Sequence, residues 1–170
     1  SSPSDRLTAL QRDVLDAFFE REAGFFLTGG AALAGFHLRH RTTDDLDLFT
    51  TDASAFERGP HVLREIAASL FAHLEVRQDA PAFKRFVLTR GRDEALVIDI
   101  VLDQTHSAAP LKLVVGRLRI DPPEEILANK LTTLIGRAEE RDLVDVYCLE
   151  RAGFRVEDAL DTALRKDGGC

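Results

Sequence analysis

Two aspartates separated by one residue follow a glycine pair, in an arrangement that suits phosphate chemistry. The segment reads LTGGAALAGFHLRHRTTDDLDLF, with Gly29-Gly30 near its start and Asp45 and Asp47 near its end. Residues i and i+2 of a β-strand point to the same face, so the two carboxylates converge while the leucines beside them face the core. Two carboxylates on one face beside a glycine turn can hold a divalent metal against the phosphates of a nucleotide. The pattern therefore indicates phosphoryl or nucleotidyl transfer.

The glycine pair has two readings. Neither residue has a Cβ, so the backbone can turn tightly and approach a ligand closely. A helix expected over residues 31–40 would then direct its free N–H groups toward that ligand, which suits phosphate. The alternative is an ordinary turn between a strand and a helix, and the pair taken alone favours that alternative.

A third carboxylate, Asp99, interrupts the apolar run Ala95–Leu102. A charge buried in such a run needs a partner. One possibility is a salt bridge to an arginine such as Arg85 or Arg117. The other is that Asp99 joins the aspartate pair as a third metal ligand from a neighbouring strand, since magnesium takes oxygen ligands and keeps room for phosphate oxygens.

Five further side chains are candidates that also have ordinary alternatives. Lys130 lies inside the apolar stripe of a predicted helix, either as a cation directed at phosphate or as a lysine at the rim of the core. Asp142 and Asp145 belong to the next helix, where acidic residues in a first turn are favourable. Arg41 and Thr43 precede the aspartate pair, either in a solvated loop or as contacts for a triphosphate or a nucleic acid.

The elements that must position these groups form an α/β pattern with a mixed sheet flanked by helices. Residue periodicity and turn residues predict strands at 25–28, 46–50, 74–77, 83–89, 95–102, 111–115 and 118–120, and helices at 4–21, 31–40, 61–71, 124–135, 141–150 and 156–164. Gly59-Pro60 is read as a break before the helix at 61–71. We expect one domain over residues 1–170, with a core at about 24–120 and a helical C-terminal third at about 122–166.

Composition limits the class of protein. The chain has 170 residues, of which 45% are hydrophobic and 30% charged, an ordinary globular composition. No apolar run is long enough to span a bilayer and the polar N-terminus lacks a signal-peptide hydrophobic region, which predicts a cytoplasmic protein without a membrane partner. The two cysteines form no disulfide framework. The net charge of −7 argues against a protein that coats nucleic acid, but not against an enzyme with a local basic patch.

In their order and spacing, these motifs resemble the DNA polymerase β-like nucleotidyltransferase superfamily. Its signature is an apolar strand, a Gly-Gly or Gly-Ser turn, an acidic-apolar-acidic-apolar strand and a later third carboxylate. More narrowly, FFLTGGAALAGFHLRHRTTDDLDLFT followed by IDPPEEILANKLTTLIGRAEERDLVDVYCL is similar to the AbiEii-type toxins of bacterial abortive-infection and toxin–antitoxin systems. The positions that fit the helical motifs of that family are Glu125, Lys130, Leu131, Arg141, Asp142, Leu143, Asp145 and Tyr147.

The resemblance implies a polymerase β-like fold and an enzyme that uses Mg²⁺ or Mn²⁺ to move a nucleotide from an NTP to an acceptor. For toxins of this family the acceptor is RNA, in some members a tRNA 3′ end, and a toxin implies a cognate antitoxin. Asp45, Asp47 and Asp99 would bind metal, with Asp99 matching only the broader superfamily. The nucleotide would meet Gly29, Gly30, Arg41, Thr43 and Lys130, and the catalytic set would be Asp45, Asp47, Asp99, Lys130 and Asp142.

Two other functions fit the same residues. The acceptor could be a protein or a cationic small molecule of the aminoglycoside kind, because an acidic protein attracts the opposite charge over long range. The C-terminal helices favour the toxin pattern instead. The chain could also be a homologue that binds nucleotide without catalysis, although the presence of all three carboxylates speaks against that.

Overall fold

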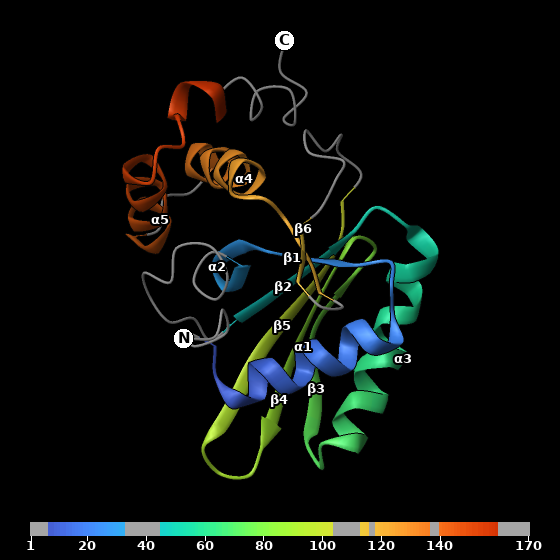
Figure 1. The fold of residues 1–170 in the computed structure, drawn as a ribbon. Coiled ribbons are helices and arrows are strands. Elements are labelled where there is room, and N and C mark those ends of the chain that lie inside the picture. Colours follow the sequence, from blue (N-terminus) through green and yellow to red (C-terminus); the bar gives the residue numbers. More distant parts are fainter. Residues whose placement is uncertain (1–6, 33–44, 104–112, 116–117, 137–139, 160–170) are drawn as a thin grey trace.

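The computed structural model describes residues 7–32, 45–103, 113–115, 118–136 and 140–159 (Figure 1). Helices and strands alternate along the first half of these residues, and helices follow at the C-terminal end. The helices are α1 (Ala9–Arg21), α2 (Gly29–Ala32), α3 (Ala53–Ser69), α4 (Pro123–Gly136) and α5 (Glu140–Arg151). The strands are β1 (Phe26–Thr28), β2 (Asp45–Thr50), β3 (His73–Ala80), β4 (Phe83–Arg90), β5 (Glu94–Leu102), β6 (Leu113–Val115) and β7 (Leu118–Ile120).

The strands form a mixed sheet in the order β3-β4-β5-β2-β1-β7-β6. Strand β2 pairs parallel with β5 and β1 pairs parallel with β7, while the remaining pairs are antiparallel. The mixed sheet with flanking helices confirms the predicted fold class. Its order places β2 in the middle of the sheet, beside a strand that lies far along the chain.

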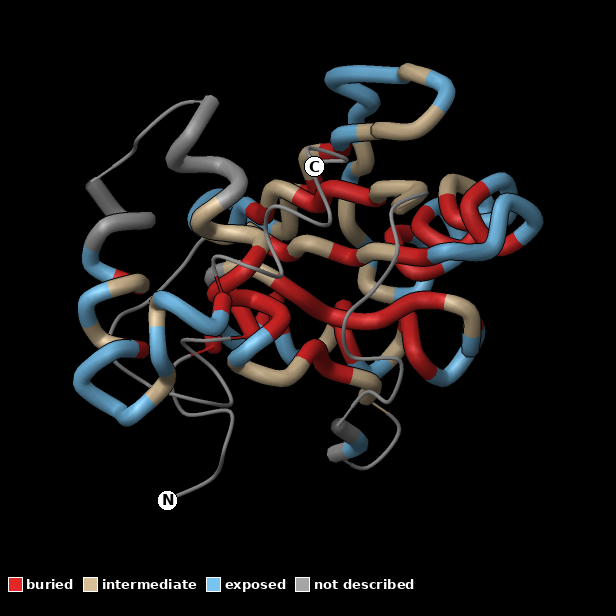
Figure 2. Tube along the Cα trace, turned by 90° about the horizontal axis from the view of Figure 1, so that it is seen from above, coloured by how far each residue is buried: buried red, intermediate tan, exposed pale blue. Residues whose placement is uncertain are grey.

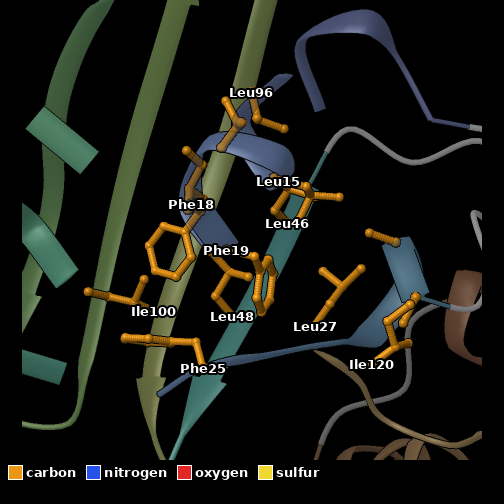
Figure 3. Packing of buried hydrophobic residues seen from close by; sticks show 14 of the residues in the cluster. Leu15, Phe18, Phe19, Phe25, Leu27, Leu46, Leu48, Leu96, Ile100 and Ile120 are labelled. Carbon is orange, nitrogen blue, oxygen red and sulfur yellow. The ribbon is translucent and has the colours of Figure 1, made fainter. Parts of the chain in front are cut away.

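Helices α1 and α3 pack on one face of the sheet, where most of the core lies (Figure 1). Leu46 and Leu48 of β2 point into this core beside the phenylalanines of α1 (Figure 3). Phe18 meets Phe25 edge to face with ring centroids 5.1 Å apart, a favourable aromatic geometry. Buried segments gather along the central strands, and exposed residues lie on the outer sides of the helices (Figure 2). This packing fixes which face of β2 carries the leucines.

Helix α1 begins later than predicted. The N-cap is Thr8, whose hydroxyl accepts from the Gln11 backbone N–H, while the Gln11 side chain accepts from the Thr8 backbone N–H. This reciprocal capping box fixes the position at which the helix begins. Residues 1–6, where the helix was expected to begin, lie outside the described residues.

Helix α3 corrects the prediction that Gly59-Pro60 breaks the chain before a helix. The helix begins at Ala53, capped by Asp52, and continues through both residues to Ser69. Proline removes one backbone hydrogen bond, but the apolar face of α3 is buried on the sheet. Gly59 serves packing instead, because a Cβ there would lie 2.8 Å from Ile100 Cδ1.

The C-terminal helices agree with the prediction to within a few residues. Helix α4 begins at Pro123, and its residues Ile126 and Leu127 join the main core. The backbone is helical again over residues 156–159, and the rest of the helix predicted at 156–164 is outside the described part of the chain. None of the helices within the described ranges combines the length and apolarity needed to cross a membrane.

Candidate functional site

Strand β2 carries Asp45 and Asp47 on one face and leucines on the other. Both aspartates are half-buried, whereas Leu46 and Leu48 have no exposed surface. The alternation follows from the period of a strand whose apolar side packs against α1. The predicted convergence of the two carboxylates is therefore confirmed.

A polar row crosses four neighbouring strands at the level of Asp47. Its Cα partner is Thr28 on β1 and, on the other side, Asp99 on β5. Asp99 in turn lies opposite Arg85 on β4. Directly paired residues share a face of the sheet. Thr28, Asp47, Asp99 and Arg85, together with Asp45 two residues before Asp47, are called the carboxylate row below.

Asp99 is held by Arg85, one of the two arginines considered from the sequence. Arg85 Nε donates to Asp99 Oδ1 at 2.8 Å, and Arg85 Nη2 donates to Asp99 Oδ2 at 3.0 Å. The Asp99 side chain is only 9% exposed and that of Arg85 is 45% exposed. These hydrogen bonds and the negative charges of Asp99, Asp45 and Asp47 raise the pKa of the Arg85 guanidinium, although burial opposes the shift. The other arginine, Arg117, is outside the described residues.

Gly29 brings the backbone against the Asp47 carboxylate. Its φ is +70°, and a Cβ at this position would lie 3.0 Å from Asp47 Cγ and overlap Asp47 Oδ2. Only glycine accepts both the left-handed backbone and this contact without strain. Gly30 follows in α2, and the segment predicted to continue that helix is outside the described residues.

Lys130 lies between two helices and not in the carboxylate row. Its Nζ is 3.0 Å from Asp145 Oδ2, with the lysine side chain 13% exposed and the aspartate completely buried. Asp145 is therefore not the first-turn surface charge expected from the sequence, because α5 begins at Glu140 and places Asp145 against α4. The backbone of Asp142 lies in α5, but its side chain is not among the described parts of the structure. Arg41 and Thr43 lie outside the described residues.

The donor chemistry of the row fits a divalent cation. Magnesium prefers carboxylate oxygens, and Asp45 and Asp47 present two carboxylates on a partly exposed face. Within the described ranges, no group of three or more His, Cys, Asp or Glu residues is arranged to hold a metal ion. This agrees with the pairing of Asp99 to Arg85, which occupies the third carboxylate.

Sequence reasoning did not find Thr28. The residue is 3% exposed, and its hydroxyl has no hydrogen-bond partner among the residues that the structure describes. A buried hydroxyl without a partner is unfavourable unless another group meets it. A threonine at the end of a strand, directly before the glycine pair, was the available signal.

Comparisons with known proteins bear on this geometry. The sequence model of a family described as "Nucleotidyl transferase AbiEii toxin, Type IV TA system" matches residues 10–169. No curated protein sequence matched significantly.

Among solved structures, the chain is similar to JHP933 from Helicobacter pylori, with a TM-score of 0.68 and 20% identity over 92% of this chain and 75% of that one. The antibiotic-resistance factor ANT(2″)-Ia has a TM-score of 0.58 and 19% identity over 91% and 87% of the two chains. MenT4, a nucleotidyltransferase toxin from Mycobacterium tuberculosis, has a TM-score of 0.55 and 15% identity over 80% of this chain and 55% of its own. These likenesses show a shared fold.

Proposed function

Because the chain belongs to the AbiEii family of nucleotidyl transferase toxins of type IV toxin–antitoxin systems, we propose that it moves a nucleotide from an NTP to RNA. The reaction would take place at the carboxylate row. The acceptor that we propose is a tRNA 3′ end, and the protein partner is a cognate antitoxin. The observation that carries the proposal is the position of Asp45 and Asp47, side by side on β2, with Gly29 against the Asp47 carboxylate.

Asp45, Asp47 and Asp99 would hold a divalent cation, Mg²⁺ or Mn²⁺. When bound, the metal supplies positive charge that neutralises the triphosphate. Gly29 and Gly30 would bring backbone N–H groups close to the phosphates, because neither residue has a side chain in the way. Asp99 would assist the acceptor hydroxyl in losing its proton. Catalysis would consist of positioning and charge stabilisation.

The remaining site residues stay predictions. Lys130 would meet the phosphates through an N–H of its ammonium group other than the one directed at Asp145. Arg41 and Thr43 would contact the triphosphate or the RNA, and Asp142 would belong to the same active site.

A labelling assay tests the proposal. Purified protein is incubated with Mg²⁺, total bacterial RNA and one NTP at a time, labelled on the α-phosphate, and the RNA is resolved on a denaturing gel. We expect one NTP to label an RNA band. Asp47→Asn should reduce labelling by about a hundredfold or more, the loss typical of removing one group that stabilises transition-state charge.

Asp93→Asn is the matched control, because it makes the same change at an exposed turn between β4 and β5. It should label RNA as the wild type does. Full activity in Asp47→Asn would contradict the mechanism.

A cationic small molecule is the second candidate acceptor, and the net charge of −7 favours it through long-range attraction. The same labelled NTP is offered with an aminoglycoside in place of RNA. Label on the aminoglycoside and none on RNA would replace the RNA acceptor. NTP binding without label on either would indicate a homologue that binds nucleotide without catalysis.

A further inference from the structure

We propose that Arg85 is an internal counterion that competes with the divalent cation for Asp99, and that it thereby sets the metal affinity of the carboxylate row. The inference rests on the proposed function, because it takes Asp45, Asp47 and Asp99 as the ligands. Arg85 is thus a positioning residue that acts through Asp99. It belongs to neither the glycine turn nor the aspartate motif.

The first observation is the geometry of the ion pair. The two N–H groups of Arg85 meet the two oxygens of Asp99 one to one, at 2.8 Å and 3.0 Å. Such a bidentate fork satisfies the carboxylate and neutralises its charge. With 9% of its side chain exposed, Asp99 has little access to water as an alternative partner. A cation that recruits Asp99 therefore competes with the guanidinium for the charge and the lone pairs of the same two oxygens.

The second observation is the difference in freedom between the two partners. Asp99 is fixed in β5, which has a strand on each side. Arg85 is 45% exposed, and its guanidinium carbon lies 5.5 Å from the centroid of the Phe83 ring. Displacing Arg85 moves one half-exposed side chain toward solvent and leaves the sheet intact. The exchange is thus a side-chain event.

The third observation is the charge around Arg85. Asp45, Asp47 and Asp99 all act electrostatically on its guanidinium. Removing this positive charge has two effects on a metal, because it frees Asp99 and also lowers the repulsion felt at the other two carboxylates. Only the first effect requires Asp99, so the two effects are separable by a double-mutant cycle.

The test is Mn²⁺ binding to the full chain without nucleotide or RNA, with free Mn²⁺ measured by electron paramagnetic resonance. We expect Arg85→Gln to bind Mn²⁺ about tenfold more tightly than the wild type, as expected for one charge removed beside a carboxylate site. In the Asp99→Asn background, Arg85→Gln should change the affinity about twofold or less, the size of a screened surface effect.

Arg77→Gln is the matched control. Arg77 lies on the edge strand β3, is 55% exposed and pairs with Glu75 at 3.3 Å. The substitution removes the same charge in the same way, and it should leave the Mn²⁺ affinity unchanged.

Thermal unfolding provides a second readout that also reports on folding. Without metal, Arg85→Gln should melt below the wild type, because Asp99 loses its partner in a buried position. Mn²⁺ should then raise its melting temperature more than it raises that of the wild type, since ligand binding stabilises in proportion to affinity.

Two results would overturn the role of Arg85. One is an unchanged Mn²⁺ affinity in Arg85→Gln, and the other is an equal increase with and without the Asp99 carboxylate. Asp47→Asn separates this question from the proposed function. If Asp47→Asn abolishes Mn²⁺ binding, the proposed metal site is supported, whatever the result for Arg85→Gln. If Asp47→Asn still binds Mn²⁺, the proposed metal site is contradicted.

Discussion

Gly29 and Gly91 have similar left-handed backbones, with φ of +70° and +64°, but only Gly29 has a neighbour in contact range of an added Cβ. We expect Gly91→Ala to lower the free energy of unfolding by about 0.5–1 kcal/mol, the left-handed strain of an L-residue less the greater entropy of glycine in the unfolded chain. Gly29→Ala should lower it by more, because the added Cβ also overlaps Asp47. Gly29→Ala should also displace the Asp47 carboxylate and reduce nucleotide transfer. Urea unfolding and RNA labelling measure the two effects separately.

Gly91→Ala is the control for strain alone, since a Cβ there meets nothing within 4 Å. Its activity should equal that of the wild type. Equal activities of the two variants would mean that the contact between Gly29 and Asp47 is not needed for transfer.

The sequence predicted the positions of some of the site's side chains and not those of others. Asp45 and Asp47 were placed correctly because the period of a strand fixes their face. The partner of Asp99 was left open, because the choice between Arg85 and Arg117 depends on which strand lies next to β5 in space. Local sequence does not contain that information. Thr28 was missed although it directly precedes the glycine pair, because its place beside Asp47 follows from the strand register.

The end of α3 has a bulky residue where glycine is favoured. Phe71 has φ of 52°, its N–H donates to the Ala68 carbonyl, and the Ala72 N–H donates to the Ala67 carbonyl at 2.8 Å. This is the hydrogen-bond pattern of a Schellman motif. Phe71 is 95% exposed, so its ring contributes little burial.

Phe71→Gly should therefore raise the free energy of unfolding by about 0.5–1 kcal/mol, the left-handed strain less the greater entropy of glycine in the unfolded chain. Urea unfolding measures the change. Phe71→Ala removes the ring and keeps the strain, so it should give no such gain. A gain of the same size in both variants would assign the effect to the exposed ring.

Glu22 joins the end of α1 to α3 and gives the protein an acid-sensitive contact. Its carboxylate accepts from Arg58 Nε at 2.8 Å and Nη2 at 3.0 Å, and from the Gly24 N–H. The hydrogen bonds from Arg58, opposed in part by burial and helped by Gly24, lower the pKa of Glu22 below its usual 4.5. The contact therefore stabilises the fold above that pH and is lost as pH falls through the lowered pKa.

We expect Glu22→Gln to lower the free energy of unfolding by about 1–2 kcal/mol at pH 7, a modest value because Arg58 is half-exposed. The difference from the wild type should shrink in urea unfolding performed well below pH 4.5. Glu94→Gln, on the exposed hairpin, should show a smaller difference at pH 7. A difference for Glu22→Gln that grows on acidification would contradict this assignment.

The boundaries of α4 and α5 were predicted to within a few residues, whereas the start of α3 was predicted wrongly. The break assigned to Gly59-Pro60 followed from local propensity. The structure keeps the helix because α3 packs so closely on β5 that Gly59 lies beside Ile100. Tertiary packing outweighs local preference here. The sign of it in the sequence was the helical spacing of Phe56, Leu63 and Ile66 across the Gly59-Pro60 pair.

The strand order is what the sequence could not provide for the molecule as a whole. The alternation of strands and helices favoured an α/β fold with a mixed sheet, which the structure confirms. The parallel pairing of β2 with β5 aligns Asp47 with Asp99 across a long stretch of chain. That pairing creates the carboxylate row, so the site depends on a contact that no local pattern specifies.

Within the helical C-terminal part of the molecule, a buried ion pair between Lys130 and Asp145 joins α4 to α5. We expect Lys130→Met to lower the free energy of unfolding by about 3 kcal/mol, because it removes a cation from beside a completely buried carboxylate. Lys84→Met is the matched control. Lys84 pairs at 2.8 Å with Asp79, which is 66% exposed and can return to water, so the loss should stay below about 1 kcal/mol.

Lys130→Met also tests whether Lys130 has a role in the reaction as well as in the structure. Asp145→Asn weakens the ion pair from its other side, so both substitutions disturb the junction of α4 and α5. If Lys130 only holds the helices together, transfer per folded molecule will fall equally in Lys130→Met and Asp145→Asn. If its ammonium also meets the phosphates, transfer per folded molecule will fall further in Lys130→Met than in Asp145→Asn. Comparing the two variants at equal folded fraction therefore decides whether a lysine buried between two helices takes part in the reaction.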